Sequence, residues 1–239
     1  MIRAVACAAA MLLSSAALAD QTVVYKGEDG KNLTLEIADS GAVHVTGPIP
    51  GQTGLVQDGE LFLIDTAQAK PRVMRLTDIA AALDEAIGPT FRGLFDAAAK
   101  ADQKPAQPLV IEAAGSTTVA GFTGETYRIK GIDKMNPDAV TEWVATRDPA
   151  LAHAGKAMLQ FMEATMVMAA PLIGDVAASM IGDMRQAFAL GTPLKAGTKF
   201  ELASVKDGAV DPARFRLPAE PISRAEMVKE MKAGVPPSE

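Results

Sequence analysis

The sequence is poor in the residues that cross-link a chain or bind a metal. Its 239 residues include one cysteine, Cys7, and two histidines, His44 and His153. Cys7 belongs to an N-terminal apolar segment that we expect to be removed, so the remaining chain has no thiol for a disulfide and depends on its core for stability. The two histidines lie far apart in sequence, and no cluster of ligand residues accompanies them. We therefore expect no metal and no cofactor.

Sequence motifs of catalysis are also missing. The chain contains no G-x-S-x-G elbow, no H-E-x-x-H and no G-x-G-x-x-G. The segment from Gly191 to Lys199 has glycines like a phosphate loop, but their spacing and the order of Thr198 and Lys199 are wrong for one. His44 falls on the polar side of an alternating segment and His153 in the first turns of a helix, so we expect both to be solvated. The sequence predicts a protein that is not an enzyme.

The charge pattern lacks any run of basic residues. The formal net charge is −6, from 23 basic and 29 acidic side chains. A nucleic-acid-binding domain normally carries a basic patch that neutralises phosphates. A mildly acidic chain without such a patch is not expected to have a nucleic-acid partner.

Long apolar runs are confined to the N-terminus. Arg3 is followed by apolar residues and then by Ala17-Leu18-Ala19, an A-x-A site before Asp20. This pattern predicts a cleavable signal peptide at residues 1–19 and a mature periplasmic chain at residues 20–239. The run is shorter than the roughly 20 residues that span a bilayer. Only six residues precede Cys7, which is too few for a lipoprotein signal.

The first third and the middle of the chain have the alternation of β-strands. Apolar and polar residues alternate in Asn32–Ile37 and again in Val43–Thr46, with a turn at Asp39-Ser40-Gly41 between them. Leu61–Ile64 has no polar break, which predicts burial on both faces. Short strands at hairpin spacing indicate an antiparallel sheet. Further strands are expected at Val23–Tyr25, Arg72–Leu76, Leu109–Ile111, Thr126–Lys130, Thr141–Ala145 and Phe200–Leu202.

A long helical stretch is predicted from Asp148 to Leu190. Asp148 is a suitable N-cap and Pro149 suits the first helical position. Pro171 should break or kink the helix. Lys156, Glu163 and Asp175 interrupt its apolar residues, so it does not predict a membrane span in the mature chain. Shorter helices are expected after Thr77-Asp78 and, at the C-terminus, after Ser223-x-x-Glu226, which matches a capping box.

Methionines mark one face of this helix. Met158, Met162 and Met166 follow one another at intervals of four residues. Thioethers can bind Cu(I), but methionine at helical spacing is far more often a flexible filler of an apolar core. We therefore interpret the stripe as the face by which the helix packs on the sheet. The expected fold is α+β, with a curved, largely antiparallel sheet packed on a long kinked helix and shorter helices.

The order of these segments resembles a known family. Strands leading to LVQDGELFLIDTAQAKPRVMRL are followed by VAGFTGETYRIKG, by VTEWVATRDPAL before the long helix, and finally by FRLP. From Val23 to Pro218 this order resembles a bacterial envelope family with a domain of unknown function, which is itself similar to the LolA and LppX lipoprotein carriers. The resemblance implies a single domain in which an antiparallel half-barrel wraps over helices around an apolar cavity.

Two functions follow, from different classes. The first is a periplasmic protein that binds or carries an apolar ligand, either a lipid or a lipidated partner, in a cavity between sheet and helix. Methionine-rich surfaces adapt to ligands of variable shape. The alternative is a non-enzymatic envelope protein with a closed core that binds another envelope protein. The residues expected to contact the apolar ligand are Met158, Phe161, Met162 and Met166 on the helix, with Trp143 and Tyr127 opposite them on the sheet.

Overall fold

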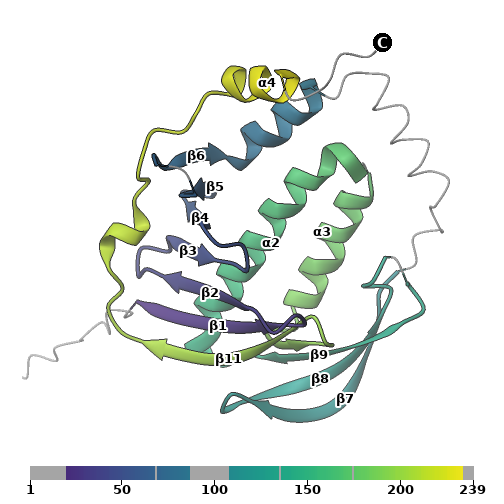
Figure 1. The fold of residues 1–239 in the computed structure, drawn as a ribbon. Coiled ribbons are helices and arrows are strands. Elements are labelled where there is room, and N and C mark those ends of the chain that lie inside the picture. The colour runs from purple at the N-terminus through teal and green to yellow at the C-terminus, as the bar shows by residue number, and fades with distance from the viewer. Residues whose placement is uncertain (1–19, 68, 87–107, 135, 174, 234–239) are drawn as a thin grey trace, which may run out of the picture.

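A computed structural model shows an α+β fold in which a large antiparallel sheet curves around helices (Figure 1). It describes residues 20–67, 69–86, 108–134, 136–173 and 175–233, so the predicted signal peptide lies outside the described residues. Residues 76–86 are helical, directly after β6. The other elements are β1 (Gln21–Gly27), β2 (Asn32–Ile37), β3 (Val43–Thr46), β4 (Gln52–Gln57), β5 (Glu60–Asp65), β6 (Arg72–Arg75), β7 (Val110–Val119), β8 (Phe122–Lys130), β9 (Val140–Thr146), η1 (Pro149–Leu151), α2 (Ala152–Ile173), α3 (Asp175–Phe188), β10 (Thr192–Ala196), β11 (Phe200–Asp207), η2 (Pro212–Phe215) and α4 (Arg224–Ala233).

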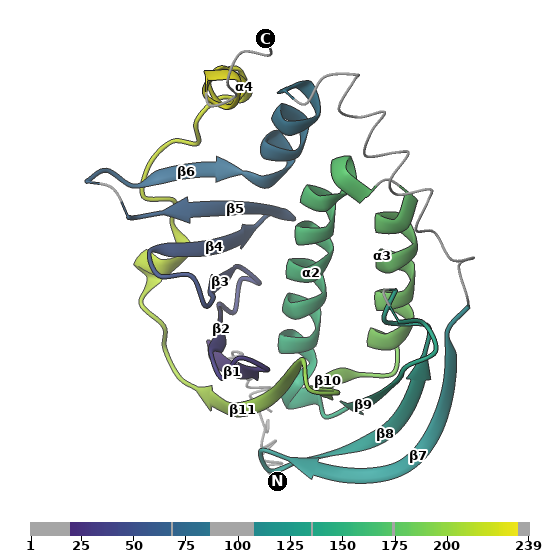
Figure 2. The same cartoon turned by 45° about the vertical axis from the view of Figure 1, so that its right-hand side comes forward.

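The sheet is one antiparallel array of 11 strands in the order β6-β5-β4-β3-β2-β1-β11-β10-β9-β8-β7. It is open, with β6 and β7 at its edges. Strands β2 and β3 have the bounds that alternation predicts, and β6 pairs with β5 as expected. Strand β1 lies at the centre, where it pairs with β2 on one side and with β11 on the other. Both views show the sheet bending so that α2 and α3 lie on its concave side (Figure 2).

The expected long helix is two helices. Helix α2 runs through Pro171 and ends at Ile173, α3 begins at Asp175, and the two lie side by side (Figure 1). Glu163 of α2 accepts a hydrogen bond from Nε of Arg185 of α3 at 2.5 Å. The helical stretch is therefore interrupted near Pro171, as the prediction of a break or a kink allows, and one long kinked helix is not confirmed. A proline near the end of a helix removes a single N–H donor, and the change of direction falls after the helix end at Ile173.

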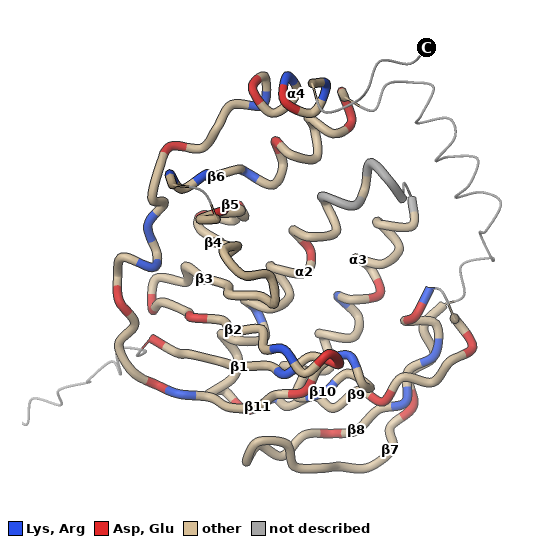
Figure 3. Tube along the Cα trace, viewed as in Figure 1, with Lys and Arg blue, Asp and Glu red and all other residues tan. Residues whose placement is uncertain are grey.

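The main core lies between α2 and the concave face of the sheet. Alternating residues of β1, β2 and β3 point inward and meet α2, which carries only two charged residues (Figure 3). Its most buried large side chains include Tyr25, Leu35, Leu151 and Leu194. Continuous burial of this kind is the dominant favourable contribution to folding.

The segment after β11 covers the convex face of the sheet. We call residues 208–223 the C-terminal strap; it runs along the outside of the sheet from β11 to α4 (Figures 1 and 2). Phe215 and Leu217 of the strap pack on Leu55 and Phe62. Since Leu61 packs in the main core and Phe62 under the strap, β5 is buried on both faces, as its unbroken apolar run predicts.

The strap ends by covering one edge of the sheet. The backbone N–H of Ile222 donates to the carbonyl of Val73 in β6 at 2.9 Å. Helix α4 follows, and its Met227 and Val228 pack against Ala82 of the helix at residues 76–86. Ser223 Oγ accepts from the N–H of Glu226 at 3.2 Å, which confirms the predicted N-terminal cap of this helix.

Candidate functional site

Helix α2 is fixed against the sheet at its N-terminus. Asp148 caps the preceding 3₁₀ turn by accepting from the N–H of Ala150 at 2.9 Å, as predicted. The hydroxyl of Thr192 in β10 then donates to the carbonyl of Leu151 at 2.9 Å. Gly155 permits this close approach, because a Cβ there would overlap the Thr192 side chain. The start of α2 is thus held at van der Waals distance from β10.

The methionine stripe enters the core at Met158. This side chain is 3 % exposed and lies in the main core with Leu35, Val45 and Ala154. Phe161 and Met162 follow on the same helix and are partly buried against that core. Met158 is therefore packed among core side chains and also reaches the hollow described next, whereas the following turn of α2 is incompletely covered.

A hollow of about 300 Å³ lies at this incompletely covered turn. We call it the methionine hollow; β1, β2 and β11 form the wall opposite α2. Its floor and walls are mostly apolar, and two lysines lie among its lining residues, Lys31 and Lys199. Both lysines are ion-paired, with Asp29 at 3.5 Å and with Glu28 at 3.2 Å. The main apolar residues that line it are Tyr25, Leu33, Met158, Phe161, Met162 and Phe200.

Tyr25 and Phe200 are residues of this hollow that sequence reasoning missed. Tyr25 alternates with Val23 in a predicted strand, so the sequence predicts that both side chains point to the same face of the sheet. The sequence does not predict that Tyr25 lies opposite α2. Its hydroxyl donates to the carbonyl of Pro193 at 3.1 Å, and burial raises the pKa of the phenol. The ring of Phe200 meets that of Tyr25 edge-on at 5.5 Å. The wall opposite Met162 is therefore aromatic.

Trp143 and Tyr127 lie elsewhere. Trp143 is 2 % exposed and contacts Phe188 of α3 edge-on at 5.7 Å and Phe200 at 6.1 Å. It shares a second core with Tyr127, whose hydroxyl donates to Glu125; this hydrogen bond is the main reason that the pKa of Tyr127 is raised. These residues face the core, as expected, but they pack against α3 and do not line the methionine hollow. Met166 is partly buried on α2 and does not line it either.

His44 is buried, contrary to the expectation that it is solvated. Its side chain lies on the convex face of β3, beneath the strap, and the residue is 6 % exposed. Its Nδ1 lies 2.8 Å from a carboxylate oxygen of Glu36 on β2, and the same carboxylate pairs with Arg214 of the strap at 3.3 Å. The polar side of this strand thus faces a segment about 170 residues away in sequence, which alternation alone does not indicate. His153 is exposed.

Two further findings bear on the class of protein. Across the described residues there is no group of three or more His, Cys, Asp or Glu side chains that could hold a metal ion. No helix in the described ranges has the length and apolar character needed to cross a membrane. No protein-family model, curated protein or solved structure matches this chain.

Proposed function

We propose that this chain is an exported periplasmic protein that binds or carries an apolar ligand, a lipid or the acyl chains of a lipidated partner, in the methionine hollow. The observation that carries the proposal is the hollow itself, about 300 Å³ of mostly apolar space between helix and sheet. Small-molecule sites begin at about this size and are lined mainly by apolar and aromatic side chains. Met158, Phe161 and Met162 belong to it.

The chemistry of the hollow favours an acyl chain over a polar ligand. The Tyr25 hydroxyl is already bound to a backbone carbonyl, and the rim lysines are paired with carboxylates. Binding would therefore come from removing apolar surface from water, at about 25 cal/mol per Å². Met162 has three rotatable bonds and can adapt to chains of different length. The curved sheet is consistent with the half-barrel that a LolA-like carrier would have.

A fluorescent fatty acid whose emission rises in an apolar environment tests this proposal. The protein should give a saturable rise in emission. Met162→Trp fills the hollow and should abolish most of it, whereas Met166→Trp, the same change one turn further along α2, should leave it in place. Circular dichroism of both variants checks that they fold. No uptake by the unmodified protein, or equal loss in both variants, would contradict the proposal.

The alternative function, an envelope interaction protein, is favoured by the edge of the sheet at β7, whose outer side pairs with no other strand of the described residues. Strand β7 is ten residues long, pairs with β8 and has mostly exposed residues. Such an edge can add a strand from another protein. If the fatty acid does not bind, cross-linking from a cysteine introduced at Thr117, which is exposed on β7, would test this function in an envelope extract; a cysteine at exposed Lys70 serves as the control. Equal products from both positions would count against it.

A further inference from the structure

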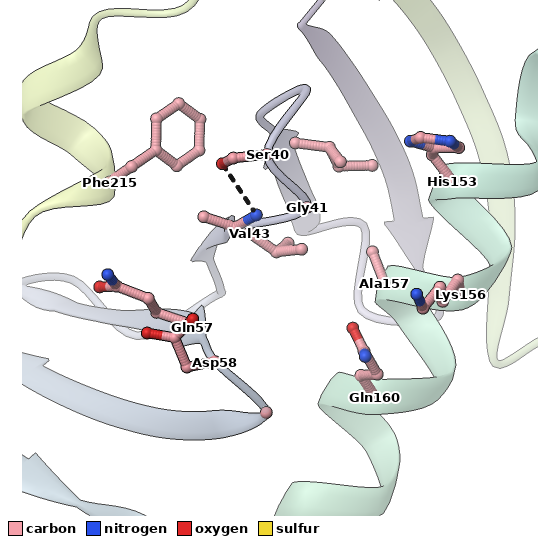
Figure 4. A pocket seen from close by; sticks show the side chains of 13 residues that line it. Ser40, Gly41, Val43, Gln57, Asp58, His153, Lys156, Ala157, Gln160 and Phe215 are labelled. Atoms are coloured by element: carbon pink, nitrogen blue, oxygen red, sulfur yellow. Dashed lines mark hydrogen bonds between the residues drawn. The ribbon is translucent and has the colours of Figure 1, made fainter. Parts of the chain in front are cut away.

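A second hollow, of about 420 Å³, lies on a different flank of α2 from the methionine hollow. We call it the polar hollow. One side is formed by α2, and the other by the β2–β3 turn, the β4–β5 turn and Phe215 of the strap (Figure 4). The two hollows have no lining residue in common. Whatever occupies the polar hollow is therefore recognised by different side chains.

The floor of the polar hollow is apolar. Ile37, Val43 and Ala157 are buried residues of the main core that reach its floor. Phe215, which the strap holds against Leu55 and Phe62 on the convex face, adds an aromatic wall. An apolar group of about the size of an aliphatic side chain would be desolvated there.

Opposite charges line its two sides. Lys156 and Gln160 lie on the helix side, while Gln57 and Asp58 lie across from them on the sheet side (Figure 4). In the described part of the chain neither Lys156 nor Asp58 makes an ion pair or a side-chain hydrogen bond. By contrast, Arg185 of α3, which lines a third hollow together with Leu61 and Leu76, is paired with Glu163.

The backbone holds Asp58 in place. Asp58 and Gly59 form the two-residue turn between β4 and β5, with φ values of 53° and 79°. Both residues of such a turn need positive φ, which aspartate, asparagine and glycine tolerate best. The turn accounts for the residue type at position 58, and it leaves the carboxylate unpartnered at the rim of the hollow.

We propose that the polar hollow binds a small zwitterion whose ammonium and carboxylate lie at opposite ends of an apolar body, namely a dipeptide of apolar residues. Its carboxylate is held by Lys156, with the Gln160 amide as a second donor, and its ammonium by Asp58. Its side chains lie on Ile37 and Phe215. Charge-assisted hydrogen bonds at both ends fix the orientation, and the apolar floor supplies desolvation.

Isothermal titration calorimetry with leucyl-leucine tests this proposal. N-acetyl-leucyl-leucine lacks the ammonium and leucyl-leucinamide lacks the carboxylate, and each should bind the unmodified protein roughly tenfold more weakly than leucyl-leucine because one charged contact is lost. Lys156→Gln should bind leucyl-leucine and its amide equally. Asp58→Asn, which keeps the turn conformation, should bind leucyl-leucine and its N-acetyl form equally.

Controls separate recognition from folding. Lys70→Gln removes an exposed lysine that lines none of the hollows described above, and it should leave all three affinities unchanged. Met162→Trp, which fills the methionine hollow, should also leave the three affinities unchanged. A failure of the dipeptide proposal can therefore be distinguished from a failure of the apolar-ligand proposal. The proposal is overturned if leucyl-leucine does not bind, if the Lys156 and Asp58 variants keep the discrimination of the unmodified protein, or if Lys70→Gln weakens binding as much as they do.

Discussion

Met158 and Met162 lie about one helical turn apart on α2, and truncating each to alanine should lower the free energy of unfolding by very different amounts. Met158 also lines the methionine hollow, but it is 3 % exposed and packs in the main core with Leu35, Val45 and Ala154. Its truncation leaves a cavity that the surroundings cannot fill, which costs about 2–5 kcal/mol. Met162 is only partly buried and borders the methionine hollow. Its truncation enlarges a space that already exists, so the expected cost is about 1 kcal/mol or less.

Urea denaturation followed by circular dichroism measures both values, provided that the dependence of the free energy on urea is the same for each variant. The difference between the two variants is more informative than either value, because uncertainty in the unfolded state largely cancels. A Met162→Ala cost equal to that of Met158→Ala would refute the reasoning. It would mean that the space around Met162 is filled and that α2 packs on the sheet without a hollow.

Two further predictions concern packing and protonation. Gly155→Ala should destabilise the protein, because the new Cβ would lie 3.1 Å from Cβ of Thr192 and would overlap the Thr192 hydroxyl. Gly182→Ala places its Cβ in open space on α3 and should stabilise the protein by about 0.5–1 kcal/mol. The thermal unfolding temperatures of the two variants test this contrast. The pKa values of Tyr25 and Tyr127 are both raised above 10, so the native protein should form phenolate at higher pH than the urea-unfolded chain in an ultraviolet titration. The part of the free energy of unfolding that comes from the raised pKa values is fully present below pH 10 and is lost as the pH rises further. Identical titration curves for the native and the urea-unfolded protein would contradict this prediction.

Local alternation predicted the strands that have one apolar and one polar face. It failed for β10, where Pro193 removes a ladder donor and Lys195 interrupts the apolar residues, although most of this strand is buried. It also placed only the first residues of β7, because β7 is exposed along most of its length and has no alternation to read. Strands without an amphipathic pattern are specified by their neighbours in the sheet.

The candidate site was predictable only along the helix. Helical spacing correctly grouped Met158 with Met162, since residues four apart share a face. It could not indicate that Trp143 would meet α3, because the sequence read α2 and α3 as one element with one face. The burial of His44 could not be predicted either, because the strap that covers it, including the Arg214 that pairs with Glu36, comes from a distant part of the sequence. Long-range pairing, which depends on the whole fold, determines these contacts.

The central position of β1 in the sheet has a consequence for the order in which the chain can fold. Strands β1 to β6 and strands β7 to β10 are joined within the sheet through β11, which pairs with β1 from Phe200 to Asp207. Until the ribosome has made β11, the first strand has one hydrogen-bonded neighbour and the two parts of the sheet are unconnected. Contacts of such sequence separation form slowly. We therefore expect a chain ending at Ala196 to be degraded by protease where the full chain resists. If the protein is exported, as we propose, such late folding would leave the chain unfolded while it passes through a translocation pore.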